Sequence, residues 1–482
     1  MTGAYEAVIG LEVHVELSTA TKMFCGCPTD FGGDPNTKTC AVCTGQPGSL
    51  PVPNRAAIEA AIALGLALSC TVAPESRFHR KNYFYPDMPK NYQISQYDVP
   101  ICAGGHLDVV VDGQTERVGI TRVHMEEDTG KSLHVGGSGR IHGAAHSLID
   151  YNRAGIPLLE VVSEPDLTSP EQARAYLAEL RGIVAALGIS DAKLEEGSMR
   201  CDANISLRAA GTAAFGTRVE VKNMNSLRSL QRAVAYEIAR QRGVLEAGEA
   251  VVQETRHWDE AAGRTETLRA KEEVFDYRYF PDPDLVPVAP DPARIEQLAE
   301  GLPELPAAAR ARLARHLPDE AAATLTDARL VGVYDDAVAA GAEPAAAGKW
   351  LANEVLSWCH EHTVDPVEVP LSGSDLAELT GFVADGRLST KLARQVLEGV
   401  LAGEGGPGAV VAARGLEQVS DDAALRALVD EAIAGDPAAA DKVRGGNPKA
   451  IGALVGAVMK ASRGQANPQR VNELLRDRLT PT

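Results

Sequence analysis

The amino-acid sequence predicts an α+β fold in which a mainly antiparallel sheet domain precedes helical segments. Residues 1–290 contain many short strand patterns, often adjacent in the chain, and only a few helical patterns. A proline-rich stretch ends this region at 280–292, and the chain beyond it carries Ala, Leu and Arg at helical spacing. A block of adjacent strands followed by a block of helices is typical of α+β proteins or of separate domains.

The first strand is predicted at residues 8–17, VIGLEVHVEL, because apolar and polar side chains alternate strictly. One face would carry Leu11, Val13, Val15 and Leu17. Successive side chains of a strand point to opposite faces, so the other face would carry Glu12, His14 and Glu16. This polar face is either the solvated side of a half-buried strand or a row of ligands or acid–base groups in a cleft.

Further elements follow in order along the first 290 residues. A helix is predicted at 169–190, because Ser169 can cap it, Pro170 fits its first turn and Gln172 completes a capping box. A second helix is predicted to start near Asn225. The remaining patterns predict strands at 199–208 and 216–224 and a hairpin at 256–270 that turns at AAGR.

Length and composition divide the chain into three predicted domains. At 482 residues it has room for three domains of ~150 residues each. We place the boundaries at 1–292, 293–404 and 405–482, with GEGGPG at 403–408 as a linker. The N-terminus lacks a basic region followed by an apolar core, and no apolar run could span a bilayer, so we expect a cytoplasmic protein.

The charge distribution singles out the C-terminal end. A formal net charge of −19 argues against nucleic-acid binding over the whole surface, since phosphate neutralisation requires Lys and Arg. From Asp441 onward, however, eight basic residues accompany only three acidic ones. The basic residues include Lys442, Arg444, Lys449, Lys460, Arg463 and Arg470. This asymmetry indicates a nucleic-acid-binding end, and the alternative is a solvated helix face.

Four of the eight cysteines cluster near the N-terminus. Cys25 and Cys27 form a C-x-C pair, Cys40 and Cys43 form a C-x-x-C pair, and twelve residues separate the pairs. In a cytosolic protein this pattern favours structural zinc over disulfides, although C-x-C is tighter than the usual first pair. Four thiolates leave no position open for water, so the zinc would hold a loop and do no chemistry. The alternative is a redox pair.

Three acidic stretches join the polar face of the first strand. They contain His124, Glu126, Glu127 and Asp128; Asp150, Glu160 and Glu164; and Asp202. Glu160 lies between apolar residues, where a carboxylate is costly to bury unless it is paired. Converging carboxylates favour a hard cation, and Mg²⁺ is usual where phosphates are handled. A His14 ligand would suit Mn²⁺ or Zn²⁺ better.

An aromatic and basic stretch lies at residues 80–98, RKNYFYPDMPKNYQISQYD. Its tyrosines and Phe84, interleaved with Arg80, Lys81 and Lys90, can stack nucleobases and contact phosphate, or they form a loop packed over a sheet. TGKS at 129–132 is not a P-loop, and no G-x-S-x-G or Cys–His nucleophile motif is evident. If ATP or glutamine is a substrate, neither is handled through a standard signature.

Nine motifs taken in order resemble one family, the B subunits of tRNA-dependent amidotransferases. They are GLEVHVEL, KNYFYPDMPKNYQISQYD, HMEEDTGKS, DYNRAGIPLLEVVSEPD, SMRCDANISLR, EVKNMNSLRSLQRAV, QETRHWDE, DYRYFPDPDLVPV and MKASRGQANPQ. The resemblance runs nearly end to end. It implies a cradle-shaped catalytic domain, a helical domain and a tail domain that binds tRNA. It also implies a heterotrimer with an amidase A subunit, which releases ammonia from glutamine, and a small C subunit.

The resemblance further implies an ATP-dependent, glutamine-hydrolysing ligase. Glu-tRNA(Gln) or Asp-tRNA(Asn) would be activated as an acyl phosphate, and ammonia would then form the amide. Carried over by motif, the Mg²⁺ or Mn²⁺ ligands are Glu12, His14, Glu127 and Glu160, with Lys81 close to the reaction centre. Spacing alone does not choose between Glu126 and Glu127.

The zinc site and the competing hypothesis do not depend on the family resemblance. The cysteine cluster occurs in only some members of the family that this chain resembles, so its zinc depends on the spacing of Cys25, Cys27, Cys40 and Cys43. The competing hypothesis is a zinc-stabilised tRNA-binding adaptor without chemistry of its own. It accounts for the cysteines and the basic end, but it leaves the acidic stretches without a role.

Overall fold

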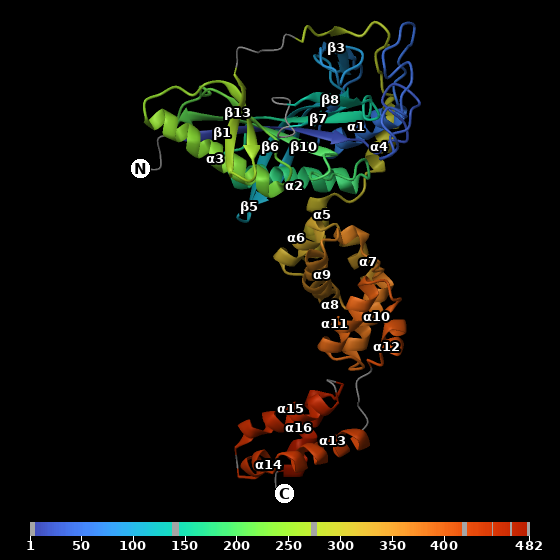
Figure 1. The fold of residues 1–482 in the computed structure, drawn as a ribbon, viewed down its shortest axis with the longest axis vertical. Coiled ribbons are helices and arrows are strands. Elements are labelled where there is room, and N and C mark those ends of the chain that lie inside the picture. The colour runs from blue at the N-terminus through green and yellow to red at the C-terminus, as the bar shows by residue number, and fades with distance from the viewer. Residues whose placement is uncertain are drawn as a thin grey trace. The chain divides into compact units, whose positions relative to one another are not determined.

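The computed structural model describes residues 5–136, 144–270, 277–416, 422–445, 447–462 and 465–479. The chain divides into two compact units, Met1–Pro306 and Ala307–Thr482. Figure 1 shows the first unit as rich in sheet and the second as helical. This sequence of a sheet-rich part followed by a helical part is the one that the amino-acid pattern predicts.

A nine-stranded sheet forms the framework of the first unit, in the order β13-β12-β11-β10-β1-β9-β6-β5-β2. All neighbouring strands are antiparallel except β11 and β12, so the prediction of a mainly antiparallel sheet is confirmed. The strands are β1 (Tyr5–Glu16), β2 (Thr71–Val72), β5 (Cys102–Val111), β6 (Gln114–Glu127), β9 (Pro157–Ser163), β10 (Met199–Ala209), β11 (Val219–Lys222), β12 (Glu254–Asp259) and β13 (Arg264–Ala270).

One face of this sheet is apolar and shares a core with two helices, α2 (Pro170–Ala186) and α3 (Leu227–Glu246). Strand β1 contributes Ile9, Leu11, Val13 and Val15, each with 0% exposure. Burial of such side chains contributes about 1.5–3 kcal/mol each, which fixes the register of the strand. The alternate residues Glu12, His14 and Glu16 must therefore lie on the opposite face, and there they are half-buried instead of fully solvated.

Local signals start both helices where the sequence predicts. Ser169 caps α2 and accepts a hydrogen bond from Gln172 N at 3.1 Å, with Pro170 in the first turn. The second half of the predicted capping box is wrong, because the Gln172 side chain accepts from Thr168 N at 2.7 Å and so bonds one residue earlier. Ser226 caps α3.

Two small sheets contain the other strands described in the first unit. One has the order β14-β3-β4, with β3 (His79–Asn82), β4 (Tyr92–Ser95) and β14 (Phe280–Pro281), and the other pairs β7 (Lys131–Val135) with β8 (His146–Asp150). The predicted hairpin forms from β12 and β13, whose last pair is Asp259 and Arg264. Helices α1 (Arg55–Ala67) and α4 (Pro292–Glu300) pack on each other.

The described part of the second unit is helical and contains two hydrophobic cores, one within 313–411 and one within 425–479. Its α-helices are α5 (Pro306–Leu313), α6 (Asp319–Asp327), α7 (Val331–Ala339), α8 (Pro344–Lys349), α9 (Leu356–His362), α10 (Gly373–Ala384), α11 (Thr390–Leu401), α12 (Pro407–Arg414), α13 (Asp422–Gly435), α14 (Pro437–Arg444), α15 (Ile451–Ala461) and α16 (Pro468–Leu479). A π-helix at Trp350–Val355 joins α8 to α9, and short 3₁₀ turns lie at Pro366–Glu368 and Pro448–Ala450.

The glycine-rich stretch at 403–408 connects two helices of one core. Helix α11 ends at Leu401, α12 begins at Pro407, and Val410 and Val411 of α12 belong to the same core as α11. Across the described ranges, we find no helix whose length and apolar content would allow it to span a membrane.

Candidate functional site

Strand register gathers charged side chains on the polar face of the large sheet. His14 on β1 is paired with Glu160 on β9, and Glu160 is paired in turn with His124 on β6. On its other side, His14 is paired with Arg200 on β10. Residues that are directly paired on neighbouring strands share a face of the sheet. Segments far apart in the sequence therefore place their acidic and imidazole groups side by side.

The first group of side chains on this face is His14, Glu126 and Glu160, whose donor atoms lie within 4.8 Å of one another. His14 Nε2 is 3.5 Å from Glu160 Oε2, and His124 Nε2 is 3.2 Å from the same oxygen. Glu126 is 2% exposed and Glu160 is 8% exposed. We call these four residues the histidine–glutamate cluster.

The charges of the histidine–glutamate cluster compensate one another. Burial alone would raise the pKa of Glu160, but His124 and His14 hold it well below its ordinary value. Burial also opposes the charged form of His124, yet Glu160 and Glu126 raise its pKa to about 9. The two carboxylates therefore favour the protonated form of His124, and the imidazole in turn favours their ionised form.

Lys81 lies beside this cluster, at the end of the aromatic and basic stretch. Its Nζ is 3.7 Å from Glu126 Oε1 and 5.1 Å from the centre of the Tyr277 ring. Burial opposes its charge, but Glu126 and the weaker contributions of Tyr279, Glu160 and Tyr277 together outweigh this effect and raise the pKa of Lys81. Glu126 also accepts hydrogen bonds from Ser95 Oγ at 2.7 Å and from Gln93 Nε2 at 3.0 Å.

Glu127 lies outside the cluster, although it is as deeply buried as Glu126. The two residues are neighbours on β6, so their side chains leave opposite faces of the strand. Glu127 forms an ion pair with Lys90 and accepts a hydrogen bond from Ile94 N at 2.8 Å. Of the two glutamates that spacing could not separate, the structure thus groups Glu126 with His14 and Glu160.

Glu12 belongs to a second group on the same face, with Asp202 and Glu220. Their oxygen atoms lie within 4.8 Å of one another, and Lys222 forms ion pairs with both Asp202 and Glu220. Burial, followed by the charge of Glu160, raises the pKa of Glu12. Sequence reasoning missed Glu220 and Lys222, although their alternation with Val219 and Val221 was the available signal.

The two groups offer different donors. His14, Glu126 and Glu160 supply one imidazole nitrogen and two carboxylate oxygens, which suits Mn²⁺ better than Mg²⁺. Glu12, Asp202 and Glu220 supply oxygen atoms alone, the donor type that Mg²⁺ prefers. Both donor sets are therefore chemically suited to divalent cations.

Two other polar groups lie near the ends of strands. Glu16 shares a hydrogen bond with Asp128, and burial together with this contact raises the pKa of Glu16 to about 8. Arg200 Nη2 lies 2.9 Å from Asp128 and balances part of this charge.

His257, Asp259 and Glu266 form a third potential donor group on β12 and β13, which sequence reasoning did not identify.

The aromatic and basic stretch forms the β3–β4 hairpin and its flanks. Arg80 forms an ion pair with Asp282 at 2.9 Å and lies over the Tyr92 ring at 4.3 Å. Ile94 is buried, whereas Phe84 and Tyr97 are 74% and 60% exposed. The stretch therefore packs over a sheet in part and presents aromatic rings to solvent in part.

The four cysteines predicted to bind zinc lie together, with their sulfur atoms within 4.8 Å of one another. Cys43 is buried, while Cys25, Cys27 and Cys40 are half-buried. A hydrogen bond from Cys25 lowers the pKa of the Cys43 thiol to about 5, and burial raises that of Cys27 to about 11. Four sulfur ligands at this spacing can hold a metal ion such as zinc.

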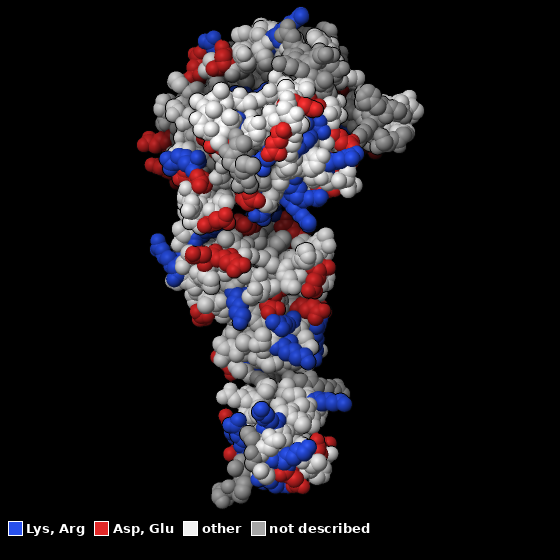
Figure 2. Space-filling view, turned by 90° about the vertical axis from the view of Figure 1, so that its left-hand side faces the viewer, with Lys and Arg blue, Asp and Glu red and all other residues white. Residues whose placement is uncertain are grey.

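The residues predicted to bind tRNA lie on the C-terminal helices. Lys442, Lys449 and Lys460 are exposed. Arg444 forms an ion pair with Asp441 at 2.9 Å, Arg470 pairs with Asp422, and Arg463 lies outside the described residues. At the bottom of the view in Figure 2, basic side chains are interspersed with acidic ones.

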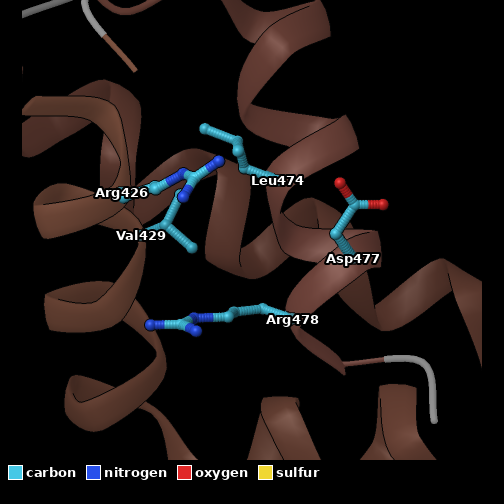
Figure 3. A pocket seen from close by; sticks show the side chains of 5 residues that line it. All are labelled: Arg426, Val429, Leu474, Asp477 and Arg478. Atoms are coloured by element: carbon cyan, nitrogen blue, oxygen red, sulfur yellow. The ribbon is translucent and has the colours of Figure 1, made fainter. Parts of the chain in front are cut away.

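A pocket of about 200 Å³ opens between α13 and α16 in the same helices. Arg426 and Arg478 reach into it from the two helices, with Val429, Leu474 and Asp477 completing its lining (Figure 3). Arg478 also pairs with Asp430 at 2.9 Å. Sequence reasoning counted Arg478 in the basic excess but did not identify Arg426.

Comparison with known proteins finds similar sequences along almost the whole chain. Residues 7–296 match the family model described as the GatB/GatE catalytic domain, and residues 332–479 match the one described as the GatB domain. The chain is 58% identical to a protein from Frankia casuarinae and to one from Salinispora arenicola, each over 98% of this chain and 96% of the relative. It is 55% identical to one from Streptomyces avermitilis, over 99% of this chain and 96% of the relative. All three relatives are named as B subunits of an aspartyl/glutamyl-tRNA(Asn/Gln) amidotransferase.

Proposed function

Because this chain belongs to the GatB family of amidotransferase B subunits, we propose that it carries out the transamidation step on misacylated tRNA. It would convert Glu-tRNA(Gln), Asp-tRNA(Asn) or both into Gln-tRNA(Gln) and Asn-tRNA(Asn), with consumption of ATP. Its partners would be an amidase A subunit, which supplies ammonia, and a small C subunit. The observation that carries this proposal is the buried histidine–glutamate cluster with Lys81 at its side.

The chemistry requires an activated carboxyl group, since a free carboxylate is a poor acyl donor. Transfer of the γ-phosphoryl group of ATP to the side-chain carboxylate gives an acyl phosphate and ADP. Ammonia then attacks the acyl carbon, phosphate leaves, and the amide remains after loss of a proton. The protein's contribution to phosphoryl transfer is mainly positioning and electrostatic stabilisation.

Each charged residue of the cluster has a part in this scheme. A divalent cation held by His14, Glu160 and a β6 glutamate would neutralise the charge that develops on the phosphates. Lys81 stays protonated and can bind a phosphoryl oxygen. His124 keeps Glu160 ionised and oriented, and it takes no direct part in bond making.

The family resemblance assigns the β6 ligand to Glu127, whereas contact geometry favours Glu126. We propose Glu126 as a direct ligand and Glu127 as the residue that anchors Lys90 and the β4 backbone beside it. Glu12 would hold a second cation with Asp202 and Glu220, close enough to Glu160 for the two sites to influence each other.

The remaining assignments stay predictions. We propose that Cys25, Cys27, Cys40 and Cys43 hold structural zinc. We also propose that residues 1–292, 293–404 and 405–482 act as cradle, helical and tail domains, with α12 at the start of the third segment packed on the core of the second. Lys442, Arg444, Lys449, Lys460, Arg463 and Arg470 of the tail would bind tRNA phosphates, and the whole assembly would work in the cytoplasm. The alternative, a zinc-stabilised tRNA adaptor, is disfavoured by the cost of burying so many ionised groups without a chemical role.

One experiment tests the proposal directly. The full chain is incubated with ATP, Mg²⁺, ammonium chloride and each misacylated tRNA, and the amino acid on the tRNA is identified. We expect Gln or Asn to appear, because ammonium replaces the ammonia from the partner. Glu126→Gln and Glu127→Gln are a matched pair of adjacent, equally buried residues, and we expect the larger loss of product with Glu126→Gln. An adaptor would give no product in any sample.

A further inference from the structure

Lys22 is an unusual residue, because its side chain is entirely buried next to the cysteine cluster. Its Nζ donates hydrogen bonds to Lys38 O at 2.8 Å and Tyr151 O at 3.2 Å, and it lies 3.8 Å from Cys43 Sγ. Among the described residues, these partners are two carbonyl oxygens and a sulfur, with no carboxylate. A buried ammonium without an anionic partner is strongly destabilising.

The cysteines can supply the missing negative charge. Zinc binds thiolates, so a centre with four cysteine ligands carries four negative charges against two positive ones. Cys43, whose sulfur lies 3.8 Å from Lys22 Nζ, is the buried member of the cluster. Lys22 thus lies where a buried cation and a doubly negative metal centre would stabilise each other.

Lys22 also connects the cysteine loop to the turn before β9. Its bond to Tyr151 O is one of several, since Asn36 N donates to Asp150 Oδ1 at 2.9 Å and Lys38 N donates to Asn152 Oδ1 at 2.8 Å. Farther along this turn, Met23 N donates to Gly155 O at 2.8 Å.

Gly155 allows the close contact between the cysteine loop and the turn before β9. Its φ of +88° favours glycine, and an added Cβ would lie 3.4 Å from Lys22 Cδ and 3.6 Å from Cys43 Cβ. Gly155 N donates to Asp128 O at 2.9 Å, and strand β9 with Glu160 begins two residues later. Lys22 is therefore packed between the cysteine cluster and the backbone that leads to the catalytic carboxylate.

From these contacts we propose that Lys22 is the positioning residue of the zinc centre. Its ammonium compensates the charge of the four-thiolate zinc, and through Tyr151 it fixes the turn at 150–156 when zinc is bound. The inference rests on the proposed zinc site and extends it, since it predicts that zinc occupancy stabilises the start of β9. It concerns no residue that contacts the substrate in our scheme.

The test measures zinc affinity of the full chain by competition with a chromogenic chelator. Lys22→Met removes the charge and keeps the length, and Lys22→Gln keeps a hydrogen-bond donor without the charge. We expect both to bind zinc at least about tenfold more weakly than the wild type. Lys38→Met is the matched control, because only its backbone carbonyl contacts Lys22 and its ammonium pairs with Asp30 at the surface.

Stability measurements on the same variants give a second, independent result. Lys22→Met should lower the melting temperature of the zinc-loaded protein more than that of the zinc-free protein, because four thiolates around zinc carry more negative charge than the cysteines do without it. Amide exchange at 150–156 should slow on zinc binding in the wild type but not in Lys22→Met.

The outcomes separate the two hypotheses. A wild-type chain that binds no zinc would contradict the proposed zinc site itself. Wild-type zinc affinity in Lys22→Gln would overturn the role of Lys22, because charge would then be irrelevant. The same melting shift with and without zinc would overturn it as well.

Discussion

The polar face of the large sheet and the C-terminal helices both carry many charges, but they hold them in opposite ways. On the sheet, Glu126, Glu160 and His124 are at most 8% exposed, and burial together with charged neighbours displaces the pKa of each from its ordinary value. On the helices, pairs such as Arg478 and Asp430 have both side chains roughly half-exposed. Water screens the second set and is excluded from the first.

This difference in burial indicates which region is suited to chemistry and which to binding a polyanion. Buried charges interact strongly and hold fixed positions, which is what phosphoryl transfer needs. Exposed charges contribute little to stability individually, but together they attract a polyanion. Removing one buried charge should therefore affect chemistry severely, and removing one exposed charge should affect binding mildly.

Glu160→Gln should have the largest effect. It removes the carboxylate shared by His14 and His124, so we expect ATP-dependent amide formation with ammonium to fall at least about 100-fold. Glu164→Gln is the control, because Glu164 is exposed just beyond the same strand and its carboxylate accepts a hydrogen bond from Thr121 Oγ1, away from the cluster. Equal activity in the two variants would show that the buried cluster has no special role.

Loss of a cysteine ligand should come next. Cys43→Ser should abolish tight zinc binding and lower the free energy of unfolding by about 2–3 kcal/mol, as expected for a structural metal. Activity per folded molecule should remain measurable, since no cysteine belongs to the histidine–glutamate cluster. Metal analysis and denaturant unfolding check this prediction. A metal-free wild-type protein with an inter-cysteine disulfide would contradict it.

The sequence predicted the two regions unequally well. Alternation at 8–17 predicted a strand with one buried face, because burial of every second residue fixes the register. It could not place Glu160 and His124 beside His14, because pairing between distant strands is decided by the whole sheet. Glu220 was missed for the same reason, since its short strand meets Glu12 only through β10.

Local signals had a similar limit. The cysteine spacing predicted a cluster that the structure brings together, since its ligands come from one loop. Lys22 lies in that same segment, yet nothing in TKMFC indicates that its side chain is buried. A lysine is ordinarily expected at the surface. Only its contacts with Cys43 and Tyr151, one local and one distant, reveal its position.

Glu59 is a partly exposed charged residue, less buried than the sheet cluster and less exposed than the ion pairs of the C-terminal helices. It accepts hydrogen bonds from Arg294 and Arg55, which lower its pKa to about 2, and it joins α1 to α4. A lowered pKa contributes stability above the unfolded value near 4.5, and this contribution disappears as the pH falls toward 2.

We therefore expect Glu59→Gln to destabilise the protein by roughly 1 kcal/mol at neutral pH. The difference from the wild type should shrink steadily below pH 4.5. Urea unfolding at several pH values measures this difference. A difference that stays constant from neutral to acidic pH would show that the ion pairs contribute nothing and that the loss arises from packing.

Single exposed lysines on the C-terminal helices should have the smallest effects. Lys460 lies on α15, outside the buried core of these helices, so Lys460→Gln should leave the fold intact. If it contacts one phosphate, the substitution should weaken tRNA binding a few-fold at low salt and reduce the slope of log affinity against log salt by about one. Activity at saturating tRNA should not change, because the substitution leaves the histidine–glutamate cluster unaltered. Lys391→Gln on α11 removes the same charge from an exposed position in the other helical core. Equal losses of tRNA affinity from both lysines would mean that tRNA binding depends only on net charge. That result would contradict the proposal that the C-terminal helices form a specific tRNA-binding tail.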